Sequence, residues 1–172
     1  WEERELLKEV VLGVIEGMRM DLACFPGETA ETLNAFDHFD QLDRYCAYIG
    51  GAPGLFWTKL CLLRLPELKD GENSSLQDLG FRLGKGLQMT NILRDIAKDL
   101  RIGRCYLPLP DLKSVELTAQ DLLNPSNFPK LRPVIKFYLD YALKNLDAGS
   151  FYVESMPSLR LRAAVAWPLL LA

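Results

Sequence analysis

Residues 87–108 read LQMTNILRDIAKDLRIGRCYLP, and this stretch decides the fold. Its apolar residues recur at the three- and four-residue spacing of an α-helix. The polar residues Gln88, Asn91, Asp95 and Asp99 are spaced three, four and four residues apart. At about 100° per residue they fall within an arc of about 80°, beside the apolar face. The stretch therefore predicts a helix with a polar stripe at the border of the core.

This polar stripe suits a divalent metal ion and an anionic ligand. Two carboxylates one helical turn apart, with an amide oxygen beside them, match the oxygen ligands that Mg²⁺ prefers. Nearby cations would bracket a polyanion; they are Arg94, Lys98, Arg101 and Arg104. The alternative is a solvated, salt-bridged helix face, because aspartates among basic residues at this spacing are common on helix surfaces. Spacing alone leaves both interpretations open.

Helical periodicity continues through the rest of the chain, and no run with β-type alternation of useful length occurs. The patterns predict helices over residues 2–22, 29 or 32 to 45, 55–65, 76–101, 118–123, 133–154 and from 159 onward. Glycines and prolines at 50–54 predict a kink or interruption. The turn and end signals are Asp70-Gly71 in a polar loop, Ser75 with Asp78 as a cap, Gly103 as a helix end and Pro133 in a first turn. The sequence predicts one all-α domain.

Composition excludes several classes of function. The net charge of −3 gives no basic surface for nucleic acid, and the single histidine, His38, argues against histidine-rich zinc sites and a Ser-His-Asp triad. The four cysteines form no CxxC and are interpreted as reduced core residues of a cytoplasmic protein. The apolar run 163–172 is too short to cross a membrane, so we expect a buried or membrane-touching last helix.

Three stretches resemble the squalene/phytoene synthase family, in the family's order along the chain. Residues 87–108 resemble its second aspartate-rich signature. Residues 16–22, EGMRMDL, resemble the segment that leads into the site. Residues 45–54, YCAYIGGAPG, resemble its Tyr-Cys-x-Tyr-x-Ala-Gly stretch, with Gly50 standing where alanine is usual. The resemblance implies an isoprenoid-synthase-type helical bundle around a central apolar cavity.

The implied activity is Mg²⁺-dependent head-to-head condensation of two prenyl diphosphates. Squalene or presqualene diphosphate from farnesyl diphosphate is slightly favoured over phytoene from geranylgeranyl diphosphate. Squalene formation would also need NADPH, although no dinucleotide fingerprint is present. The partners are then prenyl diphosphates, with peripheral membrane contact for release of an apolar product. A dry apolar cavity would protect a carbocation from water, and the glycines at 50, 51 and 54 would thin its wall.

The resemblance also assigns roles along the aspartate-rich helix. Asn91, Asp95 and Asp99 would hold Mg²⁺ that bridges to a diphosphate. Gln88 and Arg94 would contact the diphosphate or the prenyl chain.

Four residues outside that helix complete the expected site. Tyr45 matches a tyrosine with a proton-handling or cation-stabilising role; the alternative is a core aromatic residue with a satisfied hydroxyl. Asp21 would lie close to the phosphate region, unless it is only a helix-end charge. Arg104 and Tyr106 would lie at the edge of that region.

One family feature has no counterpart in the chain, namely the first aspartate-rich motif on an earlier helix. Because Trp1 already lies in a helical pattern, we interpret the chain as a fragment without those N-terminal helices and without the extreme C-terminus. Asp37, Asp40 and Asp43 are interpreted as a solvated helix face. Two other classes remain open: a non-catalytic relative that serves as an assembly or binding protein, and a generic helical interaction domain. The intact Asp95 and Asp99 argue against the former.

Overall fold

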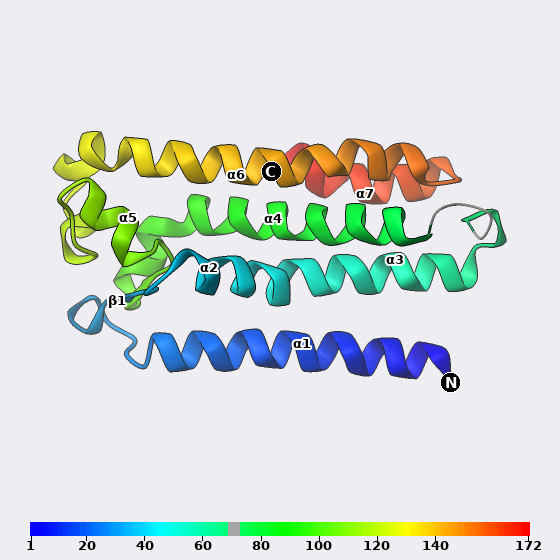
Figure 1. The fold of residues 1–172 in the computed structure, drawn as a ribbon, viewed down its shortest axis with the longest axis horizontal. Helices are drawn as coiled ribbons and strands as arrows, with labels where there is room; N and C mark the ends of the chain where they lie inside the picture. The colour runs from blue at the N-terminus through cyan, green and yellow to red at the C-terminus, as the bar shows by residue number, and fades with distance from the viewer. Residues whose placement is uncertain (69–72) are drawn as a thin grey trace.

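The computed structural model describes residues 1–68 and 73–172 and confirms an all-α fold. Figure 1 shows α1, the α2–α3 rod, α4 and α6 side by side, with α7 folded back along α6. The helices are α1 (Glu2–Cys24), α2 (Phe39–Cys46), α3 (Ala52–Arg64), α4 (Asn73–Arg101), α5 (Leu109–Ser114), α6 (Phe128–Ser155) and α7 (Leu159–Leu171). Short 3₁₀ turns occupy Ala30–Thr32, Pro66–Leu68, Gln120–Leu123 and Pro125–Asn127. The predicted turn at Asp70-Gly71 lies outside the described residues.

The predicted interruption near residue 50 is confirmed, and it takes the form of a π-helical segment. Residues Ala47–Gly51 join α2 to α3 without breaking the rod. A Cβ on Gly50 would lie 2.1 Å from the carbonyl oxygen of Gly84, and one on Gly54 would lie equally close to that of Gly80. The glycines therefore bring the backbones of the α2–α3 rod and α4 into direct contact. An alanine at position 50 would require this backbone contact to open.

The predicted start of the second helix at residue 29 or 32 is wrong. The segment instead forms a 3₁₀ turn and a short strand, β1 (Asn34–Ala35), which pairs in parallel with β2 (Arg104–Cys105). Helix α2 begins only at Phe39, because the Gln41 side chain accepts hydrogen bonds from the backbone N–H groups of Asp37 and His38. Phe36, expected on the helix, follows β1 and is fully buried in the core.

Three further boundaries differ from the sequence prediction. Helix α4 begins at Asn73, so Ser75 lies inside it and is no N-cap. Helix α6 begins at Phe128 with Pro129 in its first turn, where no backbone donor is required, and Pro133 lies within the helix. No helix was predicted where α5 forms, and the helix predicted over residues 118–123 is a 3₁₀ turn over Gln120–Leu123. Gly103 does end α4, with a φ of +81°.

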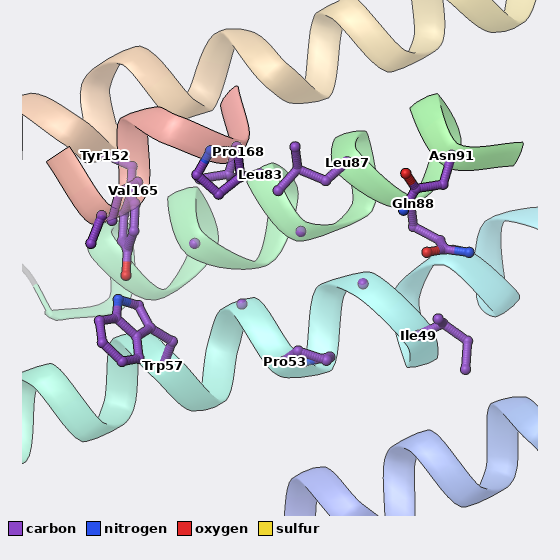
Figure 2. A pocket seen from close by; sticks show the side chains of 15 residues that line it. Ile49, Pro53, Trp57, Leu83, Leu87, Gln88, Asn91, Tyr152, Val165 and Pro168 are labelled. Atoms are coloured by element: carbon purple, nitrogen blue, oxygen red, sulfur yellow. The ribbon is translucent and has the colours of Figure 1, made fainter. Parts of the chain in front are cut away.

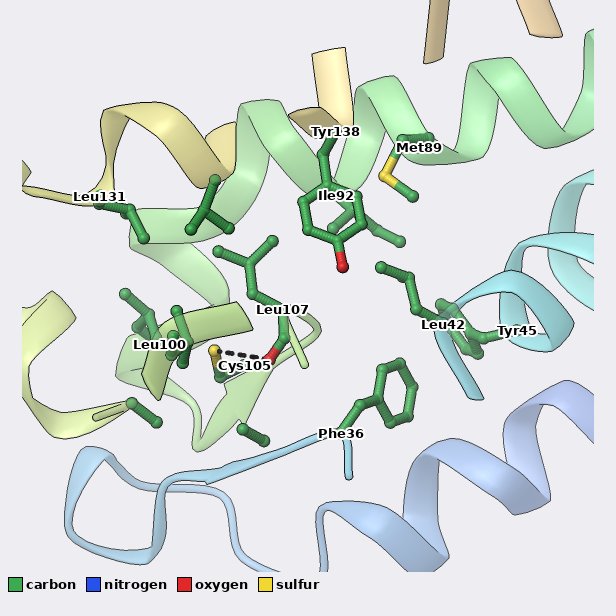
Figure 3. Packing of buried hydrophobic residues seen from close by; sticks show 14 of the residues in the cluster. Phe36, Leu42, Tyr45, Met89, Ile92, Leu100, Cys105, Leu107, Leu131 and Tyr138 are labelled. Atoms are coloured by element: carbon green, nitrogen blue, oxygen red, sulfur yellow. Dashed lines mark hydrogen bonds between the residues drawn. The ribbon is translucent and has the colours of Figure 1, made fainter. Parts of the chain in front are cut away.

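The apolar residues form two clusters at opposite ends of the bundle. The larger one lies between α2, α4, α6 and the β1–β2 pair, and Figure 3 shows Phe36, Leu42, Met89 and Tyr138 meeting there. The smaller one gathers at the far end of α4 and includes Cys61, Leu76, Leu83, Tyr152, Met156 and Val165. The four cysteines are free, as expected, with three of them buried.

Helix α1 forms as predicted, but much of its apolar face is exposed. Leu7, Val11, Ile15, Met18 and Leu22 are exposed, and only Gly17 is buried on this helix. Among the described residues, no helix combines the length and apolar character needed to cross a membrane.

Candidate functional site

The end of α1 meets β2 through an ion pair and a tyrosine hydrogen bond. Arg104 Nε donates to Asp21 Oδ2 at 3.0 Å, and the Tyr106 hydroxyl donates to Asp21 Oδ1 at 2.6 Å. The Asp21 and Arg104 side chains are only 13% and 15% exposed, so this pair is shielded from solvent screening. Gly103 turns the chain back after α4, and the β1–β2 pairing fixes Arg104 and Tyr106 beside α1. Asp21 is therefore more than a helix-end charge.

Tyr45 joins this cluster from α2. Its ring stacks on that of Tyr106, with centroids 5.0 Å apart and planes 21° apart, and the two hydroxyl oxygens are 3.4 Å apart. Burial is the largest cause that raises the pKa of both hydroxyls, and Asp21 adds to it, so both phenols stay protonated at neutral pH. Because the Tyr106 hydroxyl donates its single proton to Asp21, the Tyr45 hydroxyl donates to Tyr106.

The two carboxylates on α4 have different surroundings. Asp95 accepts hydrogen bonds from Nε and Nη2 of Arg94 at 3.1 and 3.2 Å, and this contact lowers its pKa. Asp99 makes no such contact to a described residue. Burial raises the pKa of Asp99, and the neighbouring charges of Asp95 and Asp21 raise it further. Asp99 thus lies close enough to Asp21 and Arg104 for both charges to act on it, whereas Asp95 is paired with Arg94.

A pocket of about 460 Å³ continues from the polar stripe of α4. Figure 2 shows Gln88 and Asn91 at one end and Trp57, Tyr152 and Val165 at the other. Its walls come from the π segment, α3, α4, α6 and α7, and they are mostly apolar side chains and glycine backbone.

The structure brings most of the predicted site residues together. Asp21, Tyr45, Arg104 and Tyr106 form one contiguous cluster. The charges of Asp21 and Arg104 act on Asp99, while Gln88 and Asn91 lie farther along α4 at the pocket. Arg94 is exposed, and among the described residues its hydrogen bonds and ion pair are with Asp95 alone.

The far end of the pocket was not predicted from the sequence. Gly80 and Gly84 repeat at helical spacing opposite Gly50 and Gly54, and this pattern of small residues was a usable signal. Tyr152 carried no such signal, because its hydrogen-bond partner Thr58 is distant in sequence.

Asp43 corrects another interpretation. It does not belong to a solvated face, because it accepts from Lys85 Nζ at 2.6 Å and from the Tyr141 hydroxyl. Lys85 is mostly buried, and its ammonium also lies over the rings of Phe81 and Tyr141. The contact ties α2, α4 and α6 together close to Tyr45 and Gln88.

The donor set fits a magnesium ion that takes some of its ligands from the protein and the others from a bound substrate. Within residues 1–68 and 73–172, no group of three or more His, Cys, Asp or Glu side chains is placed to hold a metal ion alone. Mg²⁺ typically binds proteins through one or two carboxylates and fills its remaining positions with water and phosphate oxygens. Asp95 and Asp99, with the Asn91 amide nearby, meet that requirement.

The arrangement of the helices matches that of a solved structure. Squalene synthase HpnC from Alicyclobacillus acidocaldarius shares the fold with a TM-score of 0.74 and 23% identity, over 94% of this chain and 55% of that one. The architecture is therefore the all-α isoprenoid synthase fold.

The family follows from the sequence comparisons. The squalene/phytoene synthase profile matches residues 1–172, so the chain belongs to the squalene/phytoene synthase family. It is 32% identical to phytoene synthase 2 of Solanum lycopersicum over 91% of this chain and 46% of the relative. It is 34% identical to phytoene synthase of Arthrospira platensis over 76% of this chain and 41% of that relative. The chain spans less than half the length of these curated relatives.

Proposed function

We propose that this chain carries the second metal-binding face and part of the prenyl pocket of a synthase that condenses two prenyl diphosphates head to head. The observation that carries the proposal is the continuity of two surfaces on α4. The stripe that ends in Asp95 and Asp99 begins at Gln88 and Asn91, and these two residues also line the apolar pocket. A ligand with an anionic head and a long apolar tail matches both surfaces.

The residues of α4 would bind the diphosphate. Asp95, Asp99 and the Asn91 amide would hold Mg²⁺, which, when bound, neutralises the charge that develops on the leaving diphosphate. Arg94 is exposed on the same helix, and its weak surface pair with Asp95 costs little to exchange for a phosphate contact. Gln88 would position the first carbons of the tail.

Tyr45 would stabilise positive charge near the reacting carbons. Its proton is directed to Tyr106, so the remaining lone pair of its oxygen and the face of its ring are available to a cation. Asp21 and Arg104 hold Tyr106 in the orientation that this arrangement needs. The hydrogen-bond direction supports a cation-stabilising role over proton donation to the substrate.

The pocket would shield one prenyl chain from water. Its lining offers few hydrogen-bonding groups beyond Gln88 and Asn91, and excluding water prevents quenching of a carbocation.

The length of the prenyl chain is the finer part of the proposal. Sequence alone slightly favoured farnesyl diphosphate, whereas the curated relatives named above are phytoene synthases. We therefore propose geranylgeranyl diphosphate as the first substrate to test and farnesyl diphosphate as the second. NADPH enters only if the product is squalene.

The test is incubation of the full-length protein with labelled farnesyl and geranylgeranyl diphosphates, with and without Mg²⁺ and NADPH. We expect a Mg²⁺-dependent condensed hydrocarbon or cyclopropyl diphosphate from at least one substrate. Asp95→Asn should abolish the product, and Asp78→Asn, an exposed position on the same helix, should not. A folded protein that binds these substrates without turnover would overturn the proposal in favour of a non-catalytic relative.

A further inference from the structure

We infer that Trp57, backed by the hydrogen-bonded Thr58–Tyr152 pair, closes the far end of the pocket and sets the length of prenyl chain that it accepts. The inference rests on the proposed function, because it assigns a specificity role within the same pocket.

The side walls of the pocket are made largely of backbone. Gly50 and Gly54 contact Gly84 and Gly80 so closely that a Cβ at any of these positions would lie 2.1 Å from an atom of the facing helix. The width of the pocket is therefore fixed by helix packing and tolerates little variation. Large side chains gather at the end of the pocket, so length is the dimension that sequence changes can adjust.

The direction of the pocket follows α4. Asn91 lines the end near the metal-binding residues, and Gly80 lines the other end, eleven residues earlier on the helix. At 1.5 Å per residue this separation is about 16 Å, enough for several isoprene units in line. Figure 2 shows Trp57 and Tyr152 at the end opposite to Gln88 and Asn91.

The Thr58–Tyr152 pair is the rigid part of that end. The Thr58 hydroxyl donates to the Gly54 carbonyl at 2.8 Å, so the Tyr152 hydroxyl donates to Thr58, at 2.7 Å. Both side chains are buried, and the hydrogen bond joins α6 to α3 beside the end of the pocket, where Tyr152 belongs to the lining. Removing the Thr58 hydroxyl would leave the buried Tyr152 hydroxyl without its hydrogen-bond partner.

Trp57 is the adjustable part. It lines the pocket and is 39% exposed, and its ring makes no hydrogen bond to a described residue. Truncating Trp57 therefore removes volume without leaving an unsatisfied polar partner. The apolar cluster that contains Cys61 and Leu83 lies next to this end, so a longer tail would find apolar surroundings there.

The experiment compares Trp57→Ala with wild type in the full-length protein, with farnesyl, geranylgeranyl and farnesylgeranyl diphosphates as substrates. We expect the ratio of kcat/KM for the substrate one isoprene unit longer to that for the preferred substrate to rise by about tenfold or more. Trp57→Phe should give an intermediate shift and provides a milder variant if Trp57→Ala folds poorly. The control is Trp167→Ala, a 65% exposed tryptophan of α7 outside the pocket lining.

A binding measurement separates this inference from the proposed function. Prenyl thiodiphosphates should shift the tryptophan emission of wild type to shorter wavelength, because the tail covers the Trp57 ring. The shift should persist in Trp167→Phe and disappear in Trp57→Phe. Active wild type with unchanged chain-length preference in both Trp57 variants would overturn the inference alone. If the protein shows no turnover but the emission shift depends on Trp57, the proposed activity is wrong, whereas the place of Trp57 at the prenyl tail is supported.

Discussion

The hydroxyl of Tyr106 lies 2.6 Å from the carboxylate of Asp21, a residue 85 positions earlier in the chain. This contact joins the end of α1 to the turn that follows α4. It also sets the direction of the hydrogen bond between Tyr45 and Tyr106, since Tyr106 has a single proton to donate. The orientation of Tyr45 thus depends on a residue that lies outside its own helix.

Tyr106→Phe should lower kcat by about tenfold, equivalent to about 1.4 kcal/mol of transition-state stabilisation, with a smaller change in KM. The substitution keeps the stacked ring but removes the acceptor for the Tyr45 proton, so Tyr45 loses its fixed orientation. The matched control is Tyr48→Phe, because the Tyr48 hydroxyl makes no hydrogen bond to the described residues. Steady-state kinetics of the full-length protein test this; equal kcat in wild type and Tyr106→Phe would contradict the positioning role.

Periodicity was sufficient to predict the fold class and the aspartate-rich helix. The face that carries Gln88, Asn91, Asp95 and Asp99 follows directly from helix geometry, and Gly103 marks the helix end correctly. The segment before Phe39 was predicted wrongly because its structure depends on pairing with Arg104–Cys105, a partner far away in sequence. Local patterns hold no information about such pairing.

The side-chain partners of individual site residues also could not be predicted from local sequence patterns. Asp43 was interpreted as a solvated charge because its neighbours in sequence are polar, yet Lys85 and Tyr141 reach it from two other helices. The Thr58–Tyr152 pair at the end of the pocket is a similar case. These contacts arise from helix packing, whereas the small-residue spacing of Gly80 and Gly84 was visible in the sequence.

Gly50→Ala should destabilise the protein by about 1–3 kcal/mol, because the new Cβ would meet the backbone of α4 and force the two helices apart. Gly13→Ala on α1 is the matched control. Its Cβ would make an ordinary 3.4 Å contact with Ala52, and alanine is favoured over glycine inside a helix by up to about 1 kcal/mol. Urea unfolding would measure both changes. Equal stabilities for the two variants would show that the close approach at Gly50 is absent.

Alkaline pH should destabilise the folded protein through its buried thiols. Burial raises the pKa of both Cys46 and Cys105 to about 12, whereas an unfolded thiol ionises near 8.5. Between these values the unfolded chain has lost protons that the folded protein retains, so the unfolding free energy falls as pH rises. Each thiol contributes up to about 1.4 kcal/mol per pH unit.

Urea midpoints at pH 8, 9 and 10 measure this dependence. Cys105→Ala should reduce the slope of the unfolding free energy against pH by the contribution of up to one proton. Cys24→Ala, at a half-buried position, should reduce this slope less. A decline that is identical in wild type and Cys105→Ala would count against a neutral buried thiol.

Asp99→Asn should raise the thermal midpoint while it abolishes turnover. The Asp99 carboxylate is half-buried and close to the charges of Asp95 and Asp21, and these surroundings raise its pKa. Removing its charge relieves burial and repulsion together, with solvent screening keeping the gain to about 1–2 °C. Asp78→Asn, at an exposed position of α4 beside Arg82, should leave both properties unchanged.

In the presence of Mg²⁺ and inorganic diphosphate, wild type should have a higher thermal midpoint than Asp99→Asn. Wild type gains stability from a ligand that binds only the folded state, whereas Asp99→Asn lacks a metal ligand and gains little. Differential scanning fluorimetry of the full-length proteins, with and without this pair of ligands, provides the measurement. If Asp99→Asn were stabilised as much as wild type, Asp99 would not be a metal ligand.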